Sequence, residues 1–292
     1  MDRHGRARAE AGESAHRLDK KQVRVAFQRA AGSYDRAARV QKELADRLLE
    51  HLDPVRISPE LVVDLGAGTG DLVLSLSDRF RQATVVAVDI AESMLRVART
   101  KSGGRDAGKR FLCADAERLP FRDASVDLVV SNATLQWLNN PDRLFAECLR
   151  ALRPGGLLMF STFGPDTLSE LRQSFAEIDS HPHVHAFLDM HDLGDALVRA
   201  GFADVVLDAA RLDAEYRDLG ELLSELKAIG ATNALAGRRR GLTGRSRLAR
   251  LAEVYEAFRV DGMLRATYEA VFAHAWKPAA RTRSVGVAPP VP

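Results

Sequence analysis

The feature that most constrains the fold is a short apolar run that ends in a glycine-rich turn. Residues 61–65 have the length and apolar character of a buried β-strand. Gly66-Ala67-Gly68-Thr69-Gly70 follows directly, and a helical pattern then runs from 71 to 80. A glycine turn between a strand and a helix lets the backbone approach a ligand closely, and it directs a helix N-terminus at polar or anionic groups. The pattern therefore predicts a ligand site at the end of the first strand.

The alternation of strands and helices continues through the centre of the chain. Strands are expected at 84–89, 111–115, 126–132, 157–163, 205–209 and 267–276. Helices are expected between them, at 93–100, 141–152 and 192–200. This alternation predicts an α/β fold, a Rossmann-like doubly wound and mostly parallel sheet.

Helical patterns outside this core predict a cap on one domain that spans residues 20–278. We expect the core at about 53–163, 192–216 and 262–277, and the helical cap at about 20–52, 164–191 and 217–261. Residues 1–19 and 279–292 have the composition of disordered tails.

Acidic side chains stand near the ends of the first three expected strands. Asp64 lies two residues before the first glycine, and Asp89 ends the second strand, where an acid binds the hydroxyls of a ribose. Asp115 ends the third strand, where it is placed to accept a hydrogen bond from an adenine amino group. The dinucleotide fingerprint G-x-G-x-x-G does not fit, because Gly70 comes one residue early. This spacing argues against NAD.

The glycine turn, the acids at 64, 89 and 115, and Arg153-Pro154-Gly155-Gly156 together resemble class I S-adenosylmethionine-dependent methyltransferases over about residues 60–163. The alternative is a purely structural role, in which these acids only cap helices and turns. The resemblance implies S-adenosylmethionine as co-substrate. It also implies a set of cofactor-binding residues: Tyr34, Asp64, Gly66, Ala67, Gly68, Asp89, Ile90, Asp115, Ala116 and Asn132.

Segments that flank this core narrow the resemblance. Those at 27–35, 131–137, 161–172, 185–194, 226–233 and 240–243 are similar to the malonyl-acyl-carrier-protein O-methyltransferases of biotin synthesis, over about residues 20–277. The resemblance implies methylation of the free carboxylate of a malonyl thioester on acyl carrier protein or coenzyme A. Two alternatives remain, a class I methyltransferase of a free small-molecule acid and a methyltransferase-like assembly factor.

The implied reaction makes modest demands on the protein. A carboxylate with a pKa near 4 is already ionised at pH 7, so we expect no catalytic general base. A cation is expected to hold the carboxylate instead, and the planar guanidinium of arginine suits it. The candidate substrate-binding residues are Trp137, Thr162, Arg172 and Arg240.

The net charge of +2 hides an uneven distribution. Residues 61–216 carry 23 acidic and 16 basic side chains, whereas residues 238–250 carry six arginines and no acid. We interpret this basic patch as a docking surface for an acidic carrier protein. The alternative is that these arginines form an ordinary solvent-exposed surface without a binding role. Nucleic acid is disfavoured, since no aromatic residues interleave. The patch consists of Arg238, Arg239, Arg240, Arg245, Arg247 and Arg250.

The sequence gives little support for a metal site or a membrane-spanning segment. The spacing of His181, His183, His185 and His191 suits no standard zinc pattern, so we expect no metal. Packing of a loop or lining of the substrate cavity is the expected role of this cluster, and the choice between the two stays open. No apolar run approaches the roughly 20 residues of a membrane helix. Residues 1–20 are basic and polar and lack the apolar region of a secretory signal, so we do not expect them to be one. Two cysteines without metal spacing complete the expectation of a reduced, cytoplasmic protein with no membrane partner.

Overall fold

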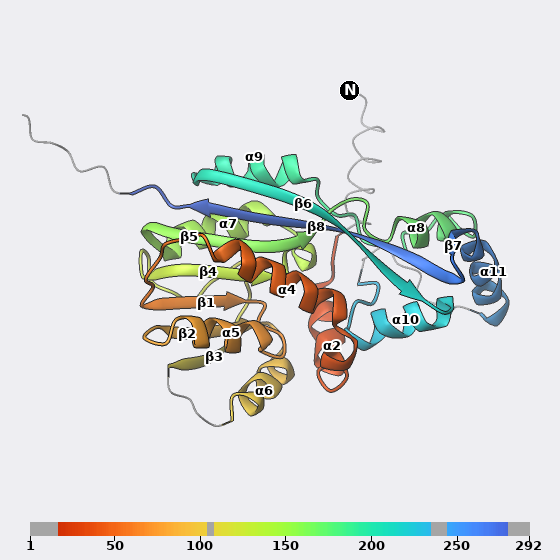
Figure 1. Ribbon diagram of the computed structural model, residues 1–292, viewed down its shortest axis with the longest axis horizontal. Helices are drawn as coiled ribbons and strands as arrows, with labels where there is room; N and C mark the ends of the chain where they lie inside the picture. Colours follow the sequence, from red (N-terminus) through yellow and green to blue (C-terminus); the bar gives the residue numbers. More distant parts are fainter. Residues whose placement is uncertain (1–16, 104–107, 235–243, 280–292) are drawn as a thin grey trace, which may run out of the picture.

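The computed structural model describes residues 17–103, 108–234 and 244–279. Within these ranges eight strands form one sheet in the order β3-β2-β1-β4-β5-β8-β6, and β7 pairs with β8 (Figure 1). The parallel strands are β1 (Leu61–Leu65), β2 (Thr84–Asp89), β3 (Lys109–Cys113), β4 (Val126–Asn132) and β5 (Leu152–Phe163). The antiparallel strands are β6 (Ala203–Tyr216), β7 (Arg259–Val260) and β8 (Met263–Trp276).

Helices connect the strands and cover both faces of the sheet. Those before and within the parallel part are α2 (Lys20–Ala30), α3 (Tyr34–Ala37), α4 (Arg39–Leu52), α5 (Asp71–Arg79), α6 (Glu92–Lys101), the 3-10 turn η1 (Leu135–Trp137) and α7 (Pro141–Ala151). Those that follow are α8 (Ser169–Ala176), α9 (Met190–Ala200), α10 (Leu219–Ala228), α11 (Arg245–Tyr255) and the 3-10 turn η2 (Glu256–Phe258).

Two hydrophobic cores lie on opposite faces of the sheet, because successive side chains of a strand point to opposite faces. Val62 and Val85 pack on one face with α4 and α5, whereas Val63 and Val86 pack on the other with α7 and α9. Burial on both faces explains the nearly continuous apolar sequence of the parallel strands. The predicted Rossmann-like α/β sheet is confirmed.

The antiparallel edge is longer than predicted. β6 has 14 residues where the sequence suggested only 205–209, and β8 begins at Met263 instead of residue 267. Both strands run past the parallel part of the sheet toward α10 and α11 (Figure 1). An edge strand needs few apolar side chains, so its charged residues hid the extension. Residues 259–260, expected to be helical, pair with β8 as β7.

Three other boundaries differ from the sequence predictions. Residues 39–52 were assigned to the cap, but α4 packs its apolar stripe against the sheet. Residues 17–19 were assigned to a tail, yet Leu18 is buried and Asp19 caps α2. Residues 153–156 precede the strand expected at 157–163 but belong to β5, and Gly155 and Gly156 exchange backbone hydrogen bonds with Lys277. The remaining tail residues, 1–16 and 280–292, lie outside the described ranges.

Candidate active site

The glycine turn after β1 is wedged between two neighbouring segments. The Gly66 and Ala67 amides both donate to the carbonyl of Val88 at the end of β2. Gly66 and Gly70 have positive φ, and a Cβ at Gly70 would lie 2.6 Å from the Cβ of Ala98 in α6. Glycine is therefore required there on both conformational and steric grounds.

Gly68 differs from its neighbours, because the space beside it is empty. Its φ is +53°, and a Cβ built there would meet no atom within 4 Å. Its amide donates to Asp89 Oδ2 at 2.9 Å, and Asp89 Oδ1 accepts from the Ala91 amide at 2.7 Å. These two hydrogen bonds fix the carboxylate of Asp89 at the carboxyl-terminal end of β2, where it faces the glycine turn.

Asp64 is buried and Asp89 is half-buried, and desolvation raises the pKa of each carboxyl. Backbone hydrogen bonds from Ala91 and Gly68 oppose this effect at Asp89. Asp64 is 1% exposed, and burial together with the charge of Asp89 raises its pKa to about 8. Its Oδ2 has no hydrogen-bond partner among the described residues. A buried acid of this kind is matched to a cationic group of a ligand.

Gly66, Gly68 and Asp89 border a cavity of about 720 Å³ at the carboxyl ends of β1, β2 and β4. Asp64 and Ala67, both expected to bind the cofactor, are not on its surface: Asp64 is buried behind the turn and Ala67 packs against the core. The other expected cofactor-binding residues line it directly: Tyr34, Gly66, Gly68, Asp89, Ile90, Asp115, Ala116 and Asn132.

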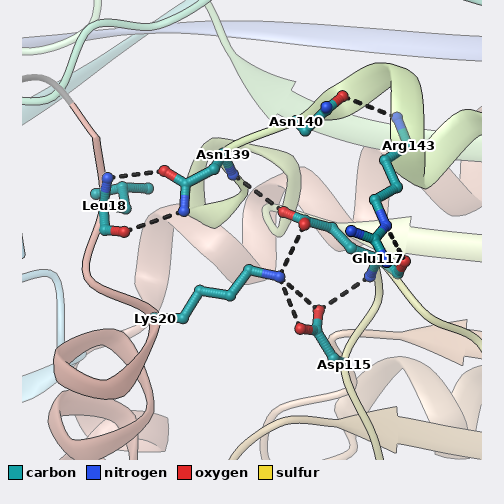
Figure 2. Close-up of polar contacts among 7 residues, drawn as sticks. All are labelled: Leu18, Lys20, Asp115, Glu117, Asn139, Asn140 and Arg143. Carbon is teal, nitrogen blue, oxygen red and sulfur yellow. Dashed lines mark hydrogen bonds and ion pairs between the residues drawn. The ribbon is translucent and has the colours of Figure 1, made fainter. Parts of the chain in front are cut away.

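The N-terminal segment crosses one end of this cavity. Figure 2 shows the Lys20 ammonium between two carboxylates, 2.7 Å from Asp115 Oδ2 and 2.9 Å from Glu117 Oε2. The side-chain amide of Asn139 holds the Leu18 backbone on both sides, accepting from its N–H at 2.8 Å and donating to its carbonyl at 3.0 Å. We call residues 17–20 the N-terminal strap.

The strap determines the state of Asp115, which lies two residues beyond β3. Partial burial raises the pKa of this carboxyl, but the bonds from Lys20 and from the Glu117 amide hold it below its ordinary value. Asp115 is therefore an ionised hydrogen-bond acceptor at neutral pH. Lys20 lines the cavity too, and sequence reasoning missed it because its partners lie 95 and more residues away in the chain.

A second cavity, of about 740 Å³, adjoins the first. Phe27, Tyr34, Ala133 and Trp137 line both cavities and form the partition between them. The Trp137 ring meets Phe27 edge-on at 5.1 Å and His185 edge-on at 4.9 Å. This aromatic partition would bring two ligands end to end in surroundings that exclude water.

Two groups at the partition are neutral at physiological pH. Burial lowers the pKa of His185 to about 4, so its imidazole is uncharged. Burial and the charges of neighbouring acids raise the pKa of the Tyr34 phenol. The sequence left His185 between loop packing and lining of the substrate cavity, and the structure places it on the wall of the second cavity. The signal available was its place in a segment that resembles the family.

The candidate substrate residues are dispersed. Trp137 lies in the partition, whereas Thr162 is buried beside the second cavity and lies 3.2 Å from Gln136 Oε1, to which its hydroxyl donates. Arg172 does not face the cavity, because its guanidinium donates to the carbonyls of Pro165 and Thr167 at 2.9 and 2.8 Å. Arg172 is absent from the lining of the second cavity, and two backbone carbonyls already engage its Nη2.

No arginine or lysine is found among the described residues that line the second cavity. Arg240, the other candidate anchor, lies outside the described residues with Arg238 and Arg239. Of the rest of the basic patch on α11, Arg247 pairs with Asp179 at 3.1 Å and Arg250 with Glu253 at 3.2 Å. Part of that patch is therefore already neutralised.

The histidines of the 181–191 segment form no metal cluster. Over the described part of the chain, no three potential ligands converge on one point. His183 bonds to Asp179 at 2.8 Å and stacks on Phe175. His191 pairs with Asp189, the N-cap residue of α9. In the same part of the chain, no helix has the length and hydropathy to cross a membrane.

Comparisons with known proteins agree with this geometry. Residues 63–160 match the family model described as a methyltransferase domain. A malonyl-[acyl-carrier protein] O-methyltransferase of Laribacter hongkongensis is 50% identical over 272 residues, 91% of this chain and 92% of the relative. A protein of the same name from Methylovorus sp. is 50% identical over 273 residues, with the same coverage.

Solved structures share the fold at low sequence identity. The YcgJ protein of Bacillus subtilis is 17% identical with a TM-score of 0.58, covering 82% of this chain and 100% of that one. Phosphoethanolamine N-methyltransferase 2 of Haemonchus contortus, in complex with S-adenosyl-L-methionine, is 21% identical with a TM-score of 0.52. It covers 80% of this chain and 52% of that one. Both likenesses concern the architecture of the sheet and its helices.

Proposed function

This chain belongs to the malonyl-[acyl-carrier protein] O-methyltransferases, and we propose from that premise how its residues carry out the reaction. The enzyme transfers a methyl group from S-adenosylmethionine to the free carboxylate of malonyl-acyl carrier protein. The product is the malonyl methyl ester that starts pimeloyl formation in biotin synthesis. The observation that carries the mechanism is the aromatic partition between two cavities of similar size.

The first cavity is our proposed cofactor site, and its donors and acceptors fit that ligand. Asp89, fixed by two backbone amides, accepts from the ribose hydroxyls. Asp115, kept ionised by Lys20, accepts from the adenine amino group. Asp64, an orphaned buried acid, lies behind the turn where a ligand ammonium would lower its pKa. S-adenosylmethionine supplies a methyl group on a sulfonium cation.

The second cavity is our proposed malonyl site. The ionised carboxylate of the substrate attacks the methyl carbon as the carbon–sulfur bond breaks. The electron pair of that bond stays on sulfur, which leaves as a neutral thioether. No proton moves, so no general base is needed. The protein's task is alignment and exclusion of water, which Phe27, Tyr34 and Trp137 perform by closing the partition.

The carboxylate anchor and the carrier surface remain proposals. With Arg172 bound to carbonyl groups, Arg240 is the candidate cation for the malonyl carboxylate. The basic patch around α11 is proposed to attract the acidic carrier protein over a longer range. We assign no role to a metal, nucleic acid or membrane. A cytoplasmic location is proposed as well, supported by the free thiols of Cys113 and Cys148.

A labelled-methyl assay tests this function. The protein is incubated with S-adenosylmethionine carrying a labelled methyl group and with malonyl-acyl carrier protein. We expect label in an alkali-labile ester on the carrier. Succinyl-acyl carrier protein and free malonate serve as comparison acceptors. Absence of transfer to the malonyl carrier, or a clear preference for another acid, would overturn the assignment.

A further inference from the structure

A third hollow lies on the surface between α2 and the end of α10. It has a volume of about 1010 Å³, and Ala26 and Ala30 form part of its apolar wall. The two elements meet closely because Gly230, with φ of +79°, has Ala30 and Phe27 beside its Cα. The Ser33 hydroxyl also donates to the Ala228 carbonyl at 2.8 Å. We call this hollow the α2–α10 groove.

The charge of the α2–α10 groove is entirely positive. Its described lining contains Arg29 and Lys227 and no aspartate or glutamate. Both side chains are exposed, and neither forms an ion pair with any residue of the described ranges. The remaining polar lining consists of short neutral groups: Gln22, Ser33, Ser224, Thr232 and Asn233.

The groove adjoins the second cavity. Thr232 and Asn233 line both hollows, so the two lie against each other at these residues. α2 separates them along the rest of its length, with Phe27 facing the cavity and Arg29 the groove. A chain-like ligand lying in the groove would thus reach the partition at which the two cavities meet.

We propose that the α2–α10 groove holds the phosphopantetheine arm of the carrier protein, with the phosphodiester between Arg29 and Lys227. This inference rests on the proposed function. An acyl carrier protein presents its thioester at the end of a pantetheine chain, which has two amides and one phosphodiester near the protein. The groove offers neutral polar groups and two exposed cations, which are the kinds of partner that the amides and the phosphodiester of this arm require.

The surface around the groove carries further cations for an acidic partner, in addition to the basic patch on α11. α2 contains no acid, and its Lys21 and Arg24 are exposed elsewhere on the same helix. On α11, by contrast, Arg247 and Arg250 are each paired with a carboxylate. Unpaired cations near a channel mouth steer an acidic protein and retain its phosphodiester, whereas paired ones contribute little.

The test uses two substrates that differ by one phosphate, malonyl-pantetheine and malonyl-4′-phosphopantetheine. The measured quantity is the ratio of their kcat/KM values, which cancels general effects on cofactor binding and folding. For the wild-type enzyme we expect the phosphorylated substrate to be preferred about tenfold, as for one charge-assisted contact. In the double variant Arg29→Ala with Lys227→Ala, the ratio should fall close to one.

A matched double variant controls for the loss of two positive charges. Arg56→Ala with Arg81→Ala removes two exposed cations from the loops before β1 and β2, at the amino-terminal ends of these strands and away from the cavities. This variant should keep the tenfold preference. The groove assignment is overturned if the wild type shows no preference, or if the Arg29/Lys227 variant retains it. If the wild type methylates neither compound nor malonyl-acyl carrier protein, the proposed function itself fails.

Discussion

Gly68→Ala separates folding from cofactor binding more cleanly than any other change in the glycine turn. At Gly66 a new methyl would collide with the side chain of Thr134, so loss of binding there would be confounded with misfolding. At Gly68 no protein atom lies within 4 Å of the new Cβ, and the free space belongs to the first cavity. The substitution therefore introduces backbone strain and an obstacle for the ligand, without a clash in the protein.

The expected loss of stability follows from the φ of +53° at Gly68. The left-handed conformation costs a residue with a Cβ about 1–2 kcal/mol, and the reduced freedom of the unfolded chain offsets about 0.5 kcal/mol of this. The net effect of about 1 kcal/mol lowers Tm by roughly 2–4 °C in a domain of this size. Gly103→Ala is the matched control, since Gly103 also has positive φ (+67°) and open space beside it.

The two variants should agree in stability and differ in binding. Thermal unfolding without cofactor is expected to show similar losses for both. Calorimetric titration with S-adenosylmethionine is expected to show a Kd raised at least about tenfold, ~1.4 kcal/mol, for Gly68→Ala and unchanged for Gly103→Ala. If Gly68→Ala binds the cofactor within twofold of wild type, the cofactor does not lie against the turn and our placement of the first cavity is wrong.

Three further predictions concern the strap and two buried ionisable groups. Lys20→Met should raise the Kd for S-adenosylmethionine roughly fivefold, about 1 kcal/mol, because Asp115 loses its ion-pair partner. Stopped-flow measurements should show this as faster dissociation of the cofactor, and an unchanged dissociation rate would contradict the prediction. Asp64 keeps its proton up to about pH 8 when folded but releases it near pH 4 when unfolded. Stability to urea should therefore fall as pH rises through that window, and Asp64→Asn should remove the slope; parallel curves for the two proteins would refute it. His185 resists protonation down to about pH 4, so stability should fall as pH drops from 6.5 to 4, by up to about 3 kcal/mol. His185→Phe should flatten that decline, and a decline of wild-type size in the variant would rule out His185 as its source.

Local sequence was sufficient for the part of the site built on parallel strands. The glycine turn and Asp89 follow from a pattern of about 30 residues, since strand, turn, helix and next strand are consecutive. The glycine turn and Asp89 then lie together at the carboxyl ends of the parallel strands, because the crossover connections are right-handed. The confirmed fold class rests on the same short-range regularities.

Long-range contacts explain what sequence reasoning missed. Asn139 grips the backbone of Leu18 across 121 positions, and no periodicity signals such a contact. Arg172 looked like a free guanidinium, because backbone carbonyls as partners leave no trace in the sequence. The extension of β6 was hidden too, since its stability comes from pairing with β8 and not from its own apolar content.

Helix α2 borders all three hollows, with Val23 on the first, Phe27 on the first and second, and Arg29 on the groove. If α2 moves as one unit when a ligand binds, the affinities for the cofactor and for the carrier-bound substrate are thermodynamically linked through it. If cofactor binding draws α2 inward, the carrier-bound substrate must bind more tightly, and it must tighten cofactor binding by the same factor. The demethylated cofactor product would then leave more readily once the methyl ester has left the neighbouring compartment, which gives the catalytic cycle a preferred order of release.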